Sequence, residues 1–485
     1  MAERLRGIDA ALLAIETPNA HLHTGMLAIL DPSGAPAGWS FESVRALVSS
    51  RLHLSPLFRR RVIVVPLELH HPVWADDPDF DLDGHVRRLT VAPPGGHDEL
   101  LDAVAAMMAV PLDRQRPLWE LHVAEGLTGG RVAVLAKSHH AASDGVSGTE
   151  LLVRLLDVAP MPAPSVVPED PPWRPAPLPT DGELLADALA ALVGRPAEAA
   201  AAVRGTVDLL GRLWRRPEAG EAPAAPMPPR PFSAPRTSLN TVLSGPQRRV
   251  ALAAVSLDEV RTVKEYFGAT VNDVVLALCA GALRSWLIRR GEDPGGDLVA
   301  LVPASVRTQA DQGALGNRVS PMLVSLATSI QDPSTRLAAI CAGARAAKAQ
   351  ERDVGSAVLA GWAEVAPPAI VTGAALMASA LRLVDLIPPV YNVSVSNLVG
   401  PPLPLYLAGA RVMAAHPLGP IVDGGALNVT VLSYDGTLWF GLVADREVVD
   451  GLESIAAGLV DALAELARSA DAATDGDAPG PAGQH

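Results

Sequence analysis

The stretch RVAVLAKSHHAASDG occupies positions 131–145 and begins as a β-strand. Its first seven residues are β-prone, and so is the preceding run at 118–124. The segment EGLTGG between the two runs supplies glycines that favour a turn. We therefore expect a β-hairpin, with a pair of histidines where its second strand ends.

The histidine pair and the residues after it suggest chemistry. Side chains alternate between the two faces of a strand, so His139 and His140 should point in opposite directions, one into the interior and one toward a cleft. A neutral imidazole in a cleft can take the proton of a hydroxyl during acyl transfer, and its usual pKa of about 6.5 suits neutral pH. Asp144 lies one turn later, and Gly145 permits a backbone shape that a Cβ would hinder.

Three other interpretations of the histidines are open. They could be core residues with satisfied hydrogen bonds, metal ligands, or members of a Ser-His-Asp hydrolase site. No further Cys/His cluster at ligand spacing supports a metal site, and no Gly-x-Ser-x-Gly sequence accompanies the pair. We expect no metal, and the pattern alone leaves a general base and a core histidine both open.

Length and composition limit the class of protein. The 485 residues favour two core domains and a linker. A net charge of −14 argues against a nucleic-acid partner. The run Arg59-Arg60-Arg61 could bind a CoA phosphate, although a solvated surface run is the ordinary interpretation. Cys279 and Cys341 lie in helix-like segments, and we expect both to be buried apolar residues in a reducing cytosol.

Hydropathy indicates whether the chain has segments that could enter or span a membrane. The N-terminus lacks the apolar region of a signal peptide, and no uninterrupted apolar run reaches the roughly 20 residues of a spanning helix. We therefore expect a soluble or peripheral protein. The apolar stretch 369–386 could lie in a membrane interface, although a buried helix of the second half is the interpretation that we favour.

The order of predicted elements suggests two lobes. Strand and helix signals alternate before position 160 and again after 240, which predicts an α/β (α+β) fold. Between them, Pro-rich runs at 160–179 and 217–235 flank an Ala-rich helical stretch, as in a crossover linker. We expect domains at 1–159 and 241–468, a linker at 160–240, and a disordered tail at 469–485.

Two local signals organise the second half. Thr270 and Asp273 have the spacing of a capping box ahead of an apolar run, which predicts that a helix begins there. The runs 428–433 and 437–444 surround Tyr434-Asp-Gly, which predicts a second hairpin.

The motif His-His-x-x-x-Asp-Gly is shared by CoA-dependent acyltransferases of the chloramphenicol acetyltransferase superfamily and by non-ribosomal peptide condensation domains. The chain resembles the bacterial wax ester synthase/diacylglycerol acyltransferase family over nearly its whole length. The resemblance rests on stretches that match in order, at 8–10, 16–23, 58–61, 77–87, 111–121, 269–276, 315–319, 396–397 and 434–436.

This resemblance implies two chloramphenicol-acetyltransferase-like lobes, with a substrate tunnel between them. It implies that His140 is the general base and that His139 is structural, packing behind the strand. Asp144 would hold the loop through ionic or hydrogen-bond contacts, and Gly145 would keep the loop open beside the tunnel.

The resemblance also implies supporting residues. Asn272 and Asp273 match the family's Asn-Asp motif, where a helix N-terminus could steady His140 or the oxyanion; for Asp273 we favour capping alone. Trp119 of Pro-Leu-Trp and Asn397 are candidates for the substrate channel, although a buried aromatic anchor is the interpretation that we favour for Trp119.

The implied reaction joins acyl-CoA and diacylglycerol to give triacylglycerol and CoA. A long-chain alcohol as acceptor would give a wax ester. No cofactor is expected, because acyl-CoA is a substrate. The reaction would take place in the cytoplasm, at the surface of a membrane or lipid inclusion. Two departures leave the acceptor open: the stretch 396–401 lacks a proline before its glycine, and the linker follows no family pattern.

Two alternative functions remain. The first is a condensation-type enzyme that takes thioesters from carrier proteins, which an isolated chain does not favour. The second is a non-catalytic lipid-droplet-binding relative that kept the fold, against which the intact histidine motif weighs.

Overall fold

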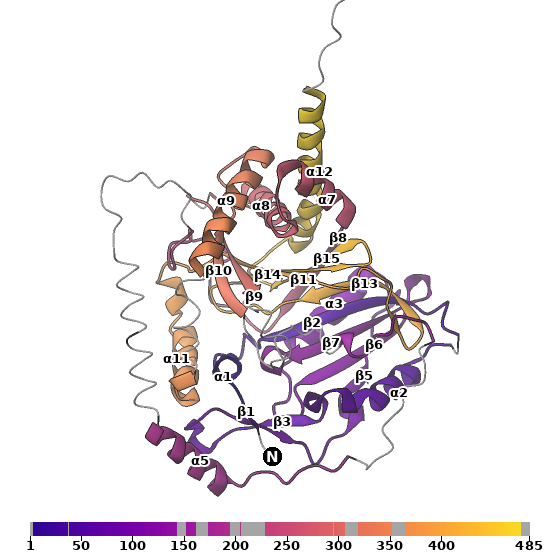
Figure 1. Ribbon diagram of the computed structural model, residues 1–485, viewed down its shortest axis with the longest axis vertical. Coiled ribbons are helices and arrows are strands. Elements are labelled where there is room, and N and C mark those ends of the chain that lie inside the picture. The colour runs from indigo at the N-terminus through magenta and orange to yellow at the C-terminus, as the bar shows by residue number, and fades with distance from the viewer. Residues whose placement is uncertain are drawn as a thin grey trace, which may run out of the picture.

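The structure is a computed structural model that describes residues 3–36, 38–142, 152–161, 173–194, 204, 228–293, 295–305, 319–351 and 364–476. Two six-stranded sheets and one three-stranded sheet form its framework (Figure 1). Figure 1 shows the two large sheets one above the other, with one group of helices on the outer side of the upper sheet. The predicted α/β architecture in two lobes is confirmed.

The sheet of the first lobe has the strand order β12-β13-β2-β7-β6-β5. The predicted hairpin is part of this sheet, since β6 and β7 pair antiparallel around a turn in which Gly129 has φ 76°. The elements of this lobe that lie in or on this sheet are β2 (His23–Asp31), α2 (Phe41–Arg51), β5 (Val86–Arg88), α3 (His97–Ala109), β6 (Trp119–Leu127) and β7 (Arg131–His139).

A smaller layer accompanies the first sheet. Its three strands have the order β1-β4-β3. It comprises β1 (Glu3–Arg4), α1 (Gly7–Ala14), β3 (Arg60–Ile63), β4 (Val73–Asp76) and, from the linker region, α5 (Asp181–Gly194). Short 3-10 turns connect the elements at η1 (Leu52–Leu54), η2 (Pro56–Phe58), η3 (Pro66–Glu68), η4 (Leu82–Gly84), η5 (Thr128–Gly130) and η6 (His140–Ala142).

The sheet of the second lobe has the order β10-β9-β11-β14-β15-β8. The second predicted hairpin is confirmed, because β14 and β15 pair antiparallel across Asp435 and Gly436. Both turn residues have positive φ, 46° and 78°, as a two-residue hairpin turn of type I′ requires. The strands are β8 (Arg248–Ser256), β9 (Val299–Ser305), β10 (Val319–Ser325), β11 (Val393–Val399), β14 (Leu427–Tyr434) and β15 (Thr437–Asp445).

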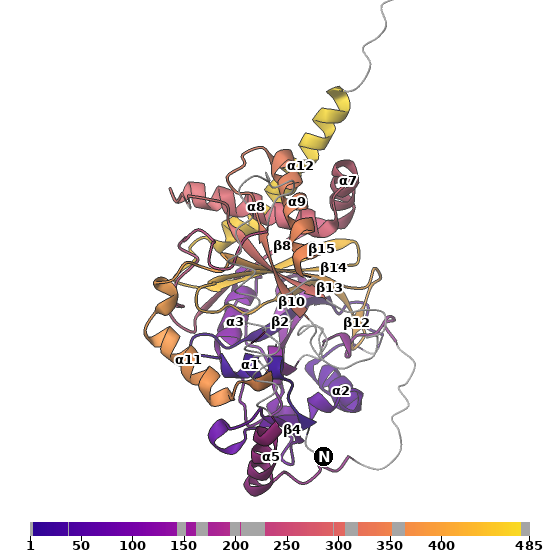
Figure 2. The same cartoon turned by 60° about the vertical axis from the view of Figure 1, so that its left-hand side comes forward.

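Helices cover the outer face of the second sheet (Figures 1 and 2). They are α7 (Leu257–Phe267), α8 (Val271–Arg289), α9 (Pro333–Glu351) and α12 (Leu452–Gly476), while α11 (Pro368–Ala380) and η8 (Leu383–Asp385) lie to one side. By length and apolarity α8 could cross a membrane, but most of its residues are buried and it packs against α12 and α9. A core position therefore accounts for its composition.

The start of α8 confirms the predicted capping box. The Thr270 hydroxyl accepts a hydrogen bond from the backbone N–H of Asp273 at 3.2 Å. The Asp273 carboxylate in turn accepts one from the backbone N–H of Thr270 at 2.9 Å. Two of the N–H groups that a helix start leaves unpaired are thus satisfied reciprocally.

One strand crosses between the lobes. Strands β12 (Tyr406–Leu407) and β13 (Ala410–Leu418) come late in the chain, yet β13 pairs with β2 of the first sheet. The two sheets meet here so closely that a Cβ on Gly441 of β15 would lie 1.9 Å from the carbonyl oxygen of Pro417. The division of the chain at 159, 240 and 468 remains a prediction, and this exchange of a strand was not part of it.

The helix α11 corrects one sequence expectation. We favoured a buried helix for this apolar stretch, but Ile370 is 66% exposed, Met377 60% and Leu381 59%. The helix packs against α1 and also contacts η3 and η8, which leaves these apolar side chains exposed among the residues that the structure describes. Its apolar composition therefore does not reflect a place in the core.

The arginine run 59–61 is not a solvated surface run either. The guanidinium group of Arg59 lies 4.4 Å from the ring centroid of Trp173. Arg60 forms an ion pair with Asp76 at 3.3 Å, and Arg61 donates to the carbonyl oxygen of Gln115 at 3.0 Å. All three side chains therefore have partners within the protein. Both cysteines are buried and free, as expected.

Candidate active site

Strand β7 ends at two histidines with different surroundings. The side chain of His139 is buried, with 1% exposed, whereas His140 is partly exposed and opens the turn η6, which packs against α1. The backbone N–H of His140 donates to the carbonyl oxygen of Leu22 at 3.0 Å. This contact ties the turn to the residue before β2. The two side chains differ in burial, and their pointing in opposite directions stays a prediction, because His140 already lies in the turn η6.

The ring of His139 is held by hydrogen bonds at both nitrogens. The backbone N–H of Ala141 donates to Nδ1 at 2.9 Å, so Nδ1 must be unprotonated. The proton therefore resides on Nε2, which lies 3.0 Å from Oε1 of Glu16 and donates to it. His139 thus shapes the turn that carries His140 and is itself positioned by a carboxylate.

Glu16 also belongs to an ion pair. Arg114 donates from Nε to Oε2 of Glu16 at 3.1 Å and from Nη2 to the carbonyl oxygen of Leu13 at 2.6 Å. Burial alone would raise the pKa of Glu16, but the hydrogen bonds and charges of His139 and Arg114 outweigh it, and the pKa is lowered. Glu16 is therefore ionised at neutral pH. Sequence reasoning did not identify it as a site residue, and its only signal was its place in the family-like stretch 16–23.

The ring of His140 is suited to act as a base. Burial and the neighbouring His139 lower its pKa, and a hydrogen bond to its own backbone partly offsets this. A ring with a lowered pKa is neutral at neutral pH and can therefore accept a proton.

A buried lysine supports the same strand. Lys137 is fully buried, and its Nζ donates to the carbonyl oxygens of Met107, at 2.9 Å, and Val110 at the C-terminal end of α3. The carbonyl of Met107 also accepts the backbone N–H of Val110 at 3.4 Å, and the cation at this helix end complements the helix dipole. Burial lowers the pKa of Lys137 to about 8, although Glu120 nearby opposes this.

Other predicted site residues are distributed differently. Asp144 and Gly145 lie outside the described residues. Asn272 is partly exposed in the first turn of α8, beside the capping residue Asp273, whose carboxylate is occupied by Thr270. Capping accounts for Asp273, and a contact of Asn272 with the reacting groups stays a prediction.

The two channel candidates differ in burial. Trp119 is buried, donates from Nε1 to the carbonyl oxygen of Phe58 at 3.0 Å, and stacks on His85 with ring centroids 4.6 Å apart. It is thus an aromatic anchor of the first lobe's core, the interpretation favoured from the sequence. Asn397 pairs with Val431 of β14, and its side chain is partly exposed.

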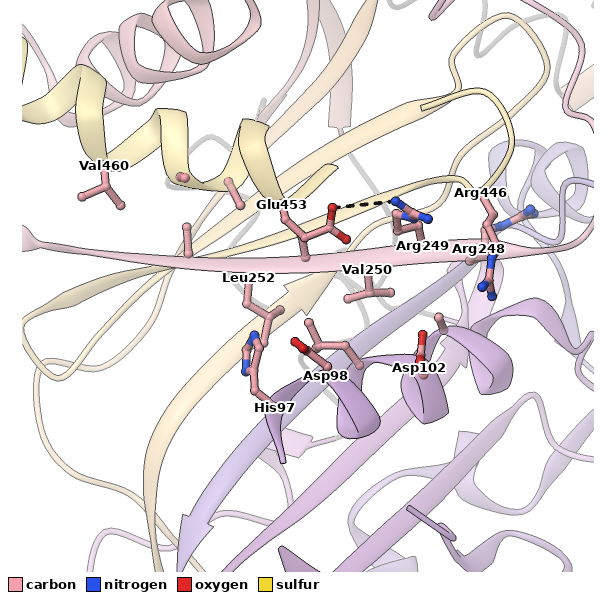
Figure 3. A pocket seen from close by; sticks show the side chains of 16 residues that line it. His97, Asp98, Asp102, Arg248, Arg249, Val250, Leu252, Arg446, Glu453 and Val460 are labelled. Carbon is pink, nitrogen blue, oxygen red and sulfur yellow. Dashed lines mark ion pairs between the residues drawn. The ribbon is translucent and has the colours of Figure 1, made fainter. Parts of the chain in front are cut away.

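A groove of about 470 Å³ opens where the lobes meet (Figure 3), and neither histidine of the pair is among the residues that line it. It runs along the edge strand β8, with α3 on one side and α12 on the other. Arg249 forms an ion pair with Glu453 across its wall at 3.7 Å, and Arg248 lies at one end. Within the described ranges, no group of three or more His, Cys, Asp or Glu side chains is arranged to hold a metal ion.

Comparison with known proteins places this architecture in a family. Residues 5–275 match the family described as wax ester synthase/diacylglycerol acyltransferase catalytic domain, and residues 315–467 match the WS/DGAT C-terminal domain. The chain belongs to the wax ester synthase/diacylglycerol acyltransferase family. It is accordingly an enzyme of the acyltransferase class.

Relatives and solved structures agree with this assignment. A candidate diacylglycerol O-acyltransferase of Mycobacterium tuberculosis (strain CDC 1551) is 37% identical over 98% of this chain and 92% of its own length. The wax ester synthase/diacylglycerol acyltransferase from Marinobacter aquaeolei VT8 superposes with a TM-score of 0.67 at 28% identity, covering 96% of this chain and all of the other.

A more distant likeness concerns the fold alone. The first condensation domain of a calcium-dependent antibiotic synthetase superposes with a TM-score of 0.53 at 15% identity, covering 97% of this chain and 96% of the other. The predicted relation to condensation domains is confirmed at the level of architecture.

Proposed function

We propose that this acyltransferase moves the acyl group of an acyl-CoA directly onto the hydroxyl of diacylglycerol, or of a long-chain alcohol, with His140 as general base. The observation that carries the proposal is the state of His140: a partly exposed ring in the turn that follows β7, with a lowered pKa. Such a ring is neutral at neutral pH. We infer that Nε2 is its basic nitrogen, because Nδ1 lies nearer to the residue's own backbone, to which the ring is hydrogen-bonded.

The reaction needs one base and no covalent intermediate. Nε2 of His140 takes the hydroxyl proton while the hydroxyl oxygen attacks the thioester carbon. The tetrahedral intermediate then collapses, the C–S bond breaks, and the imidazolium returns the proton to the sulfur of CoA. Acyl-CoA is consumed as a substrate, so the proposal requires no cofactor. The amide of Asn272, at a helix N-terminus, is our candidate for stabilising the oxyanion, and Asp144 for holding the loop after the motif.

The assay that tests this proposal uses the purified full chain and radiolabelled acyl-CoA. Diacylglycerol and a series of long-chain alcohols serve as acceptors, and thin-layer chromatography separates triacylglycerol from wax esters. We expect turnover with free acyl-CoA. Activity only with an acyl group loaded on a carrier protein would instead establish a condensation-type enzyme, and lipid binding without turnover would establish a non-catalytic relative.

We further propose that α11 and the turn after it rest on the lipid surface from which the acceptor comes. Between Glu364 and Arg382 the sequence has no charged residue. Large apolar side chains are exposed along α11 and the residues after it, up to 77% for Leu386. An exposed apolar surface of this kind, on which α11 itself carries no charge, complements a lipid interface.

The position of α11 supports this proposal. The helix packs on α1, and α1 packs on the turn that carries His140 (Figures 1 and 2). The carboxylate of Glu364 accepts a hydrogen bond from the backbone N–H of Gly7 at 2.9 Å, which fastens the segment before α11 to the start of α1. A lipid surface against α11 would thus lie one helix away from the base, in keeping with a peripheral enzyme of the cytoplasm.

Flotation with lipid vesicles tests the surface. The double variant Ile370→Ser, Met377→Ser should no longer float with phosphatidylcholine vesicles that contain diacylglycerol, yet should keep its activity toward a short, water-soluble alcohol. The control is Ile288→Ser, whose side chain is 60% exposed on α8. Undiminished flotation of the double variant would overturn this part of the proposal without affecting the role of His140.

A further inference from the structure

The two buried histidines that flank Leu22 in the chain each have an unpaired ring nitrogen among the residues that the structure describes. His21 and His23 are 7% and 4% exposed, and Nδ1 of each is buried. Neither Nδ1 atom has a hydrogen-bond partner among the residues that the structure describes. Buried polar nitrogens are normally paired, so two neighbouring exceptions indicate a ligand.

The partners of the other two ring nitrogens define what each Nδ1 can do. Nε2 of His21 lies 2.8 Å from the carbonyl oxygen of Pro18, which can only accept, so Nε2 carries the proton and Nδ1 is an acceptor. Nε2 of His23 instead accepts the backbone N–H of Leu112 at 3.3 Å, so the proton of a neutral ring lies on Nδ1, a donor. Burial lowers the pKa of both rings, well below the usual range for His23, which keeps them neutral.

The space between the lobes fits one small group. A cavity of about 10 Å³ is lined by both histidines, Met108 and Arg248, which is the room that a single oxygen needs. The ring centroids of His21 and His23 are 5.5 Å apart, compatible with one oxygen at about 2.8 Å from a nitrogen of each ring. The guanidinium of Arg248 is already engaged by the carbonyl oxygens of Gly245 and Asn19.

We propose that His21 and His23 form a binding site for one hydroxyl oxygen, which accepts a hydrogen bond from Nδ1 of His23 and donates one to Nδ1 of His21. A hydroxyl is the group that matches this pair, because it has both a proton and lone pairs. A water molecule and the hydroxyl of an alcohol share this chemistry. Arg248 lines both this cavity and the groove of Figure 3.

The site bears on catalysis through the residue between the two histidines. The carbonyl oxygen of Leu22 accepts the backbone N–H of His140 at 3.0 Å, and Leu22 has a positive φ of 45°. A bound oxygen that bridges His21 and His23 would stabilise the backbone conformation of Leu22, whose carbonyl oxygen binds the N–H of His140. His21 and His23 would then be positioning residues for the base.

Crystal structures of the purified full chain test the site. In the wild-type protein we expect one ordered oxygen within about 3.2 Å of both Nδ1 atoms. His21→Gln and His23→Gln should lose it, because the longer amide can replace Nε2 toward Pro18 or Leu112 but not Nδ1. The matched variants His21→Asn and His23→Asn place an amide group near Nδ1 and should retain the oxygen.

Crystals soaked in 1-octanol, together with steady-state kinetics, distinguish the two sources. If an alcohol occupies the site, the octanol oxygen replaces the water, and His21→Gln raises the KM for the alcohol about two- to tenfold while the KM for acyl-CoA is unchanged. If the site holds a structural water, the same oxygen remains in octanol and the KM for the alcohol does not change. Either result confirms a hydroxyl site. No ordered oxygen in the wild-type protein, or rings turned so that both Nδ1 atoms bind protein groups, would overturn the proposal even if the enzyme is active.

Discussion

Oε1 of Glu16 lies 3.0 Å from Nε2 of His139, although 123 residues separate them in the chain. The backbone N–H of Ala141 occupies Nδ1 of the same ring, so the carboxylate holds His139 in a single tautomer and orientation. The turn that carries His140 is therefore built on a ring that Glu16 positions, with Arg114 holding Glu16 in turn.

Glu16 is predicted to matter for rate rather than for substrate binding. Glu16→Ala leaves Nε2–H of His139 without its acceptor in a buried place, a loss of about 1–3 kcal/mol. If the same free energy is added to the activation barrier of acyl transfer, kcat falls about 5- to 150-fold. The KM for acyl-CoA should be unchanged. Glu16→Gln should recover most of the rate, because its amide oxygen still accepts.

The control for this experiment is Glu42→Ala, because Glu42 pairs with Arg88 at the surface with its side chain 70% exposed. It should leave kcat unchanged. Wild-type kcat in a folded Glu16→Ala protein would show that the carboxylate does not position the site.

The rate should also depend on pH in a defined direction. His140 acts as a base only when its ring is neutral, and its pKa is lowered from the usual 6.5. We therefore expect kcat/KM to be constant from about pH 7 to 8 and to fall in proportion to acidity only below pH 6.5. Measurement with a soluble alcohol over pH 5–8 checks this. An inflection above pH 7 would mean that another group controls the rate.

Local signals predicted much of the framework. Both hairpins could be found from glycine-containing turns between β-prone runs, and the start of α8 from the spacing of Thr270 and Asp273, because these signals act over a few residues. The crossing of β13 to the first sheet could not, since its apolar pattern fits either sheet. The exposure of α11 was missed because apolar composition alone does not distinguish a lipid-facing surface from a core.

Some residues of the candidate site could be predicted from the sequence and others could not, again because only local signals can be found in a sequence. His139 and His140 are adjacent in the sequence where a predicted strand ends, so their different surroundings could be expected from the local pattern. The pairing of Glu16 with His139, and the proximity of the His21 and His23 rings, depend on contacts that only the folded chain creates. Family resemblance marked the stretch 16–23 without assigning a role to any residue in it.

Lys137 gives a prediction about stability. Its pKa is about 8 in the folded protein against about 10.5 when unfolded, so between these values the unfolded chain binds more protons and stability rises with pH. The rise can reach about 3 kcal/mol. Hydrogen bonds from Nζ to the carbonyls of Met107 and Val110 favour the charged form and make the rise smaller.

Urea unfolding at pH 8 and pH 10 measures this rise. Lys137→Met should abolish it, whereas Lys348→Met, at an exposed position of α9, should retain it. An equal gain of stability in the wild-type and Lys137→Met proteins would show that Lys137 is charged in the folded protein throughout this range.

Two neighbouring residues at the start of α8 are predicted to have different roles, one in stability and one in catalysis. Asp273→Ala removes the reciprocal cap and should lower the free energy of unfolding by about 1 kcal/mol with little change in kcat. Asn272→Ala should leave stability unchanged and lower kcat about 10²-fold if its amide stabilises the oxyanion. Thermal unfolding of the two variants measures the change in stability, and steady-state kinetics measures the change in kcat. Normal kcat in Asn272→Ala would remove Asn272 from the mechanism.

The base itself is tested most directly by the rate of acyl transfer from acyl-CoA to diacylglycerol in His140→Ala. The account predicts a loss of at least about 10²- to 10⁴-fold, with unfolding temperature and vesicle flotation as in the wild type. Transfer at the wild-type rate by the folded variant would contradict it.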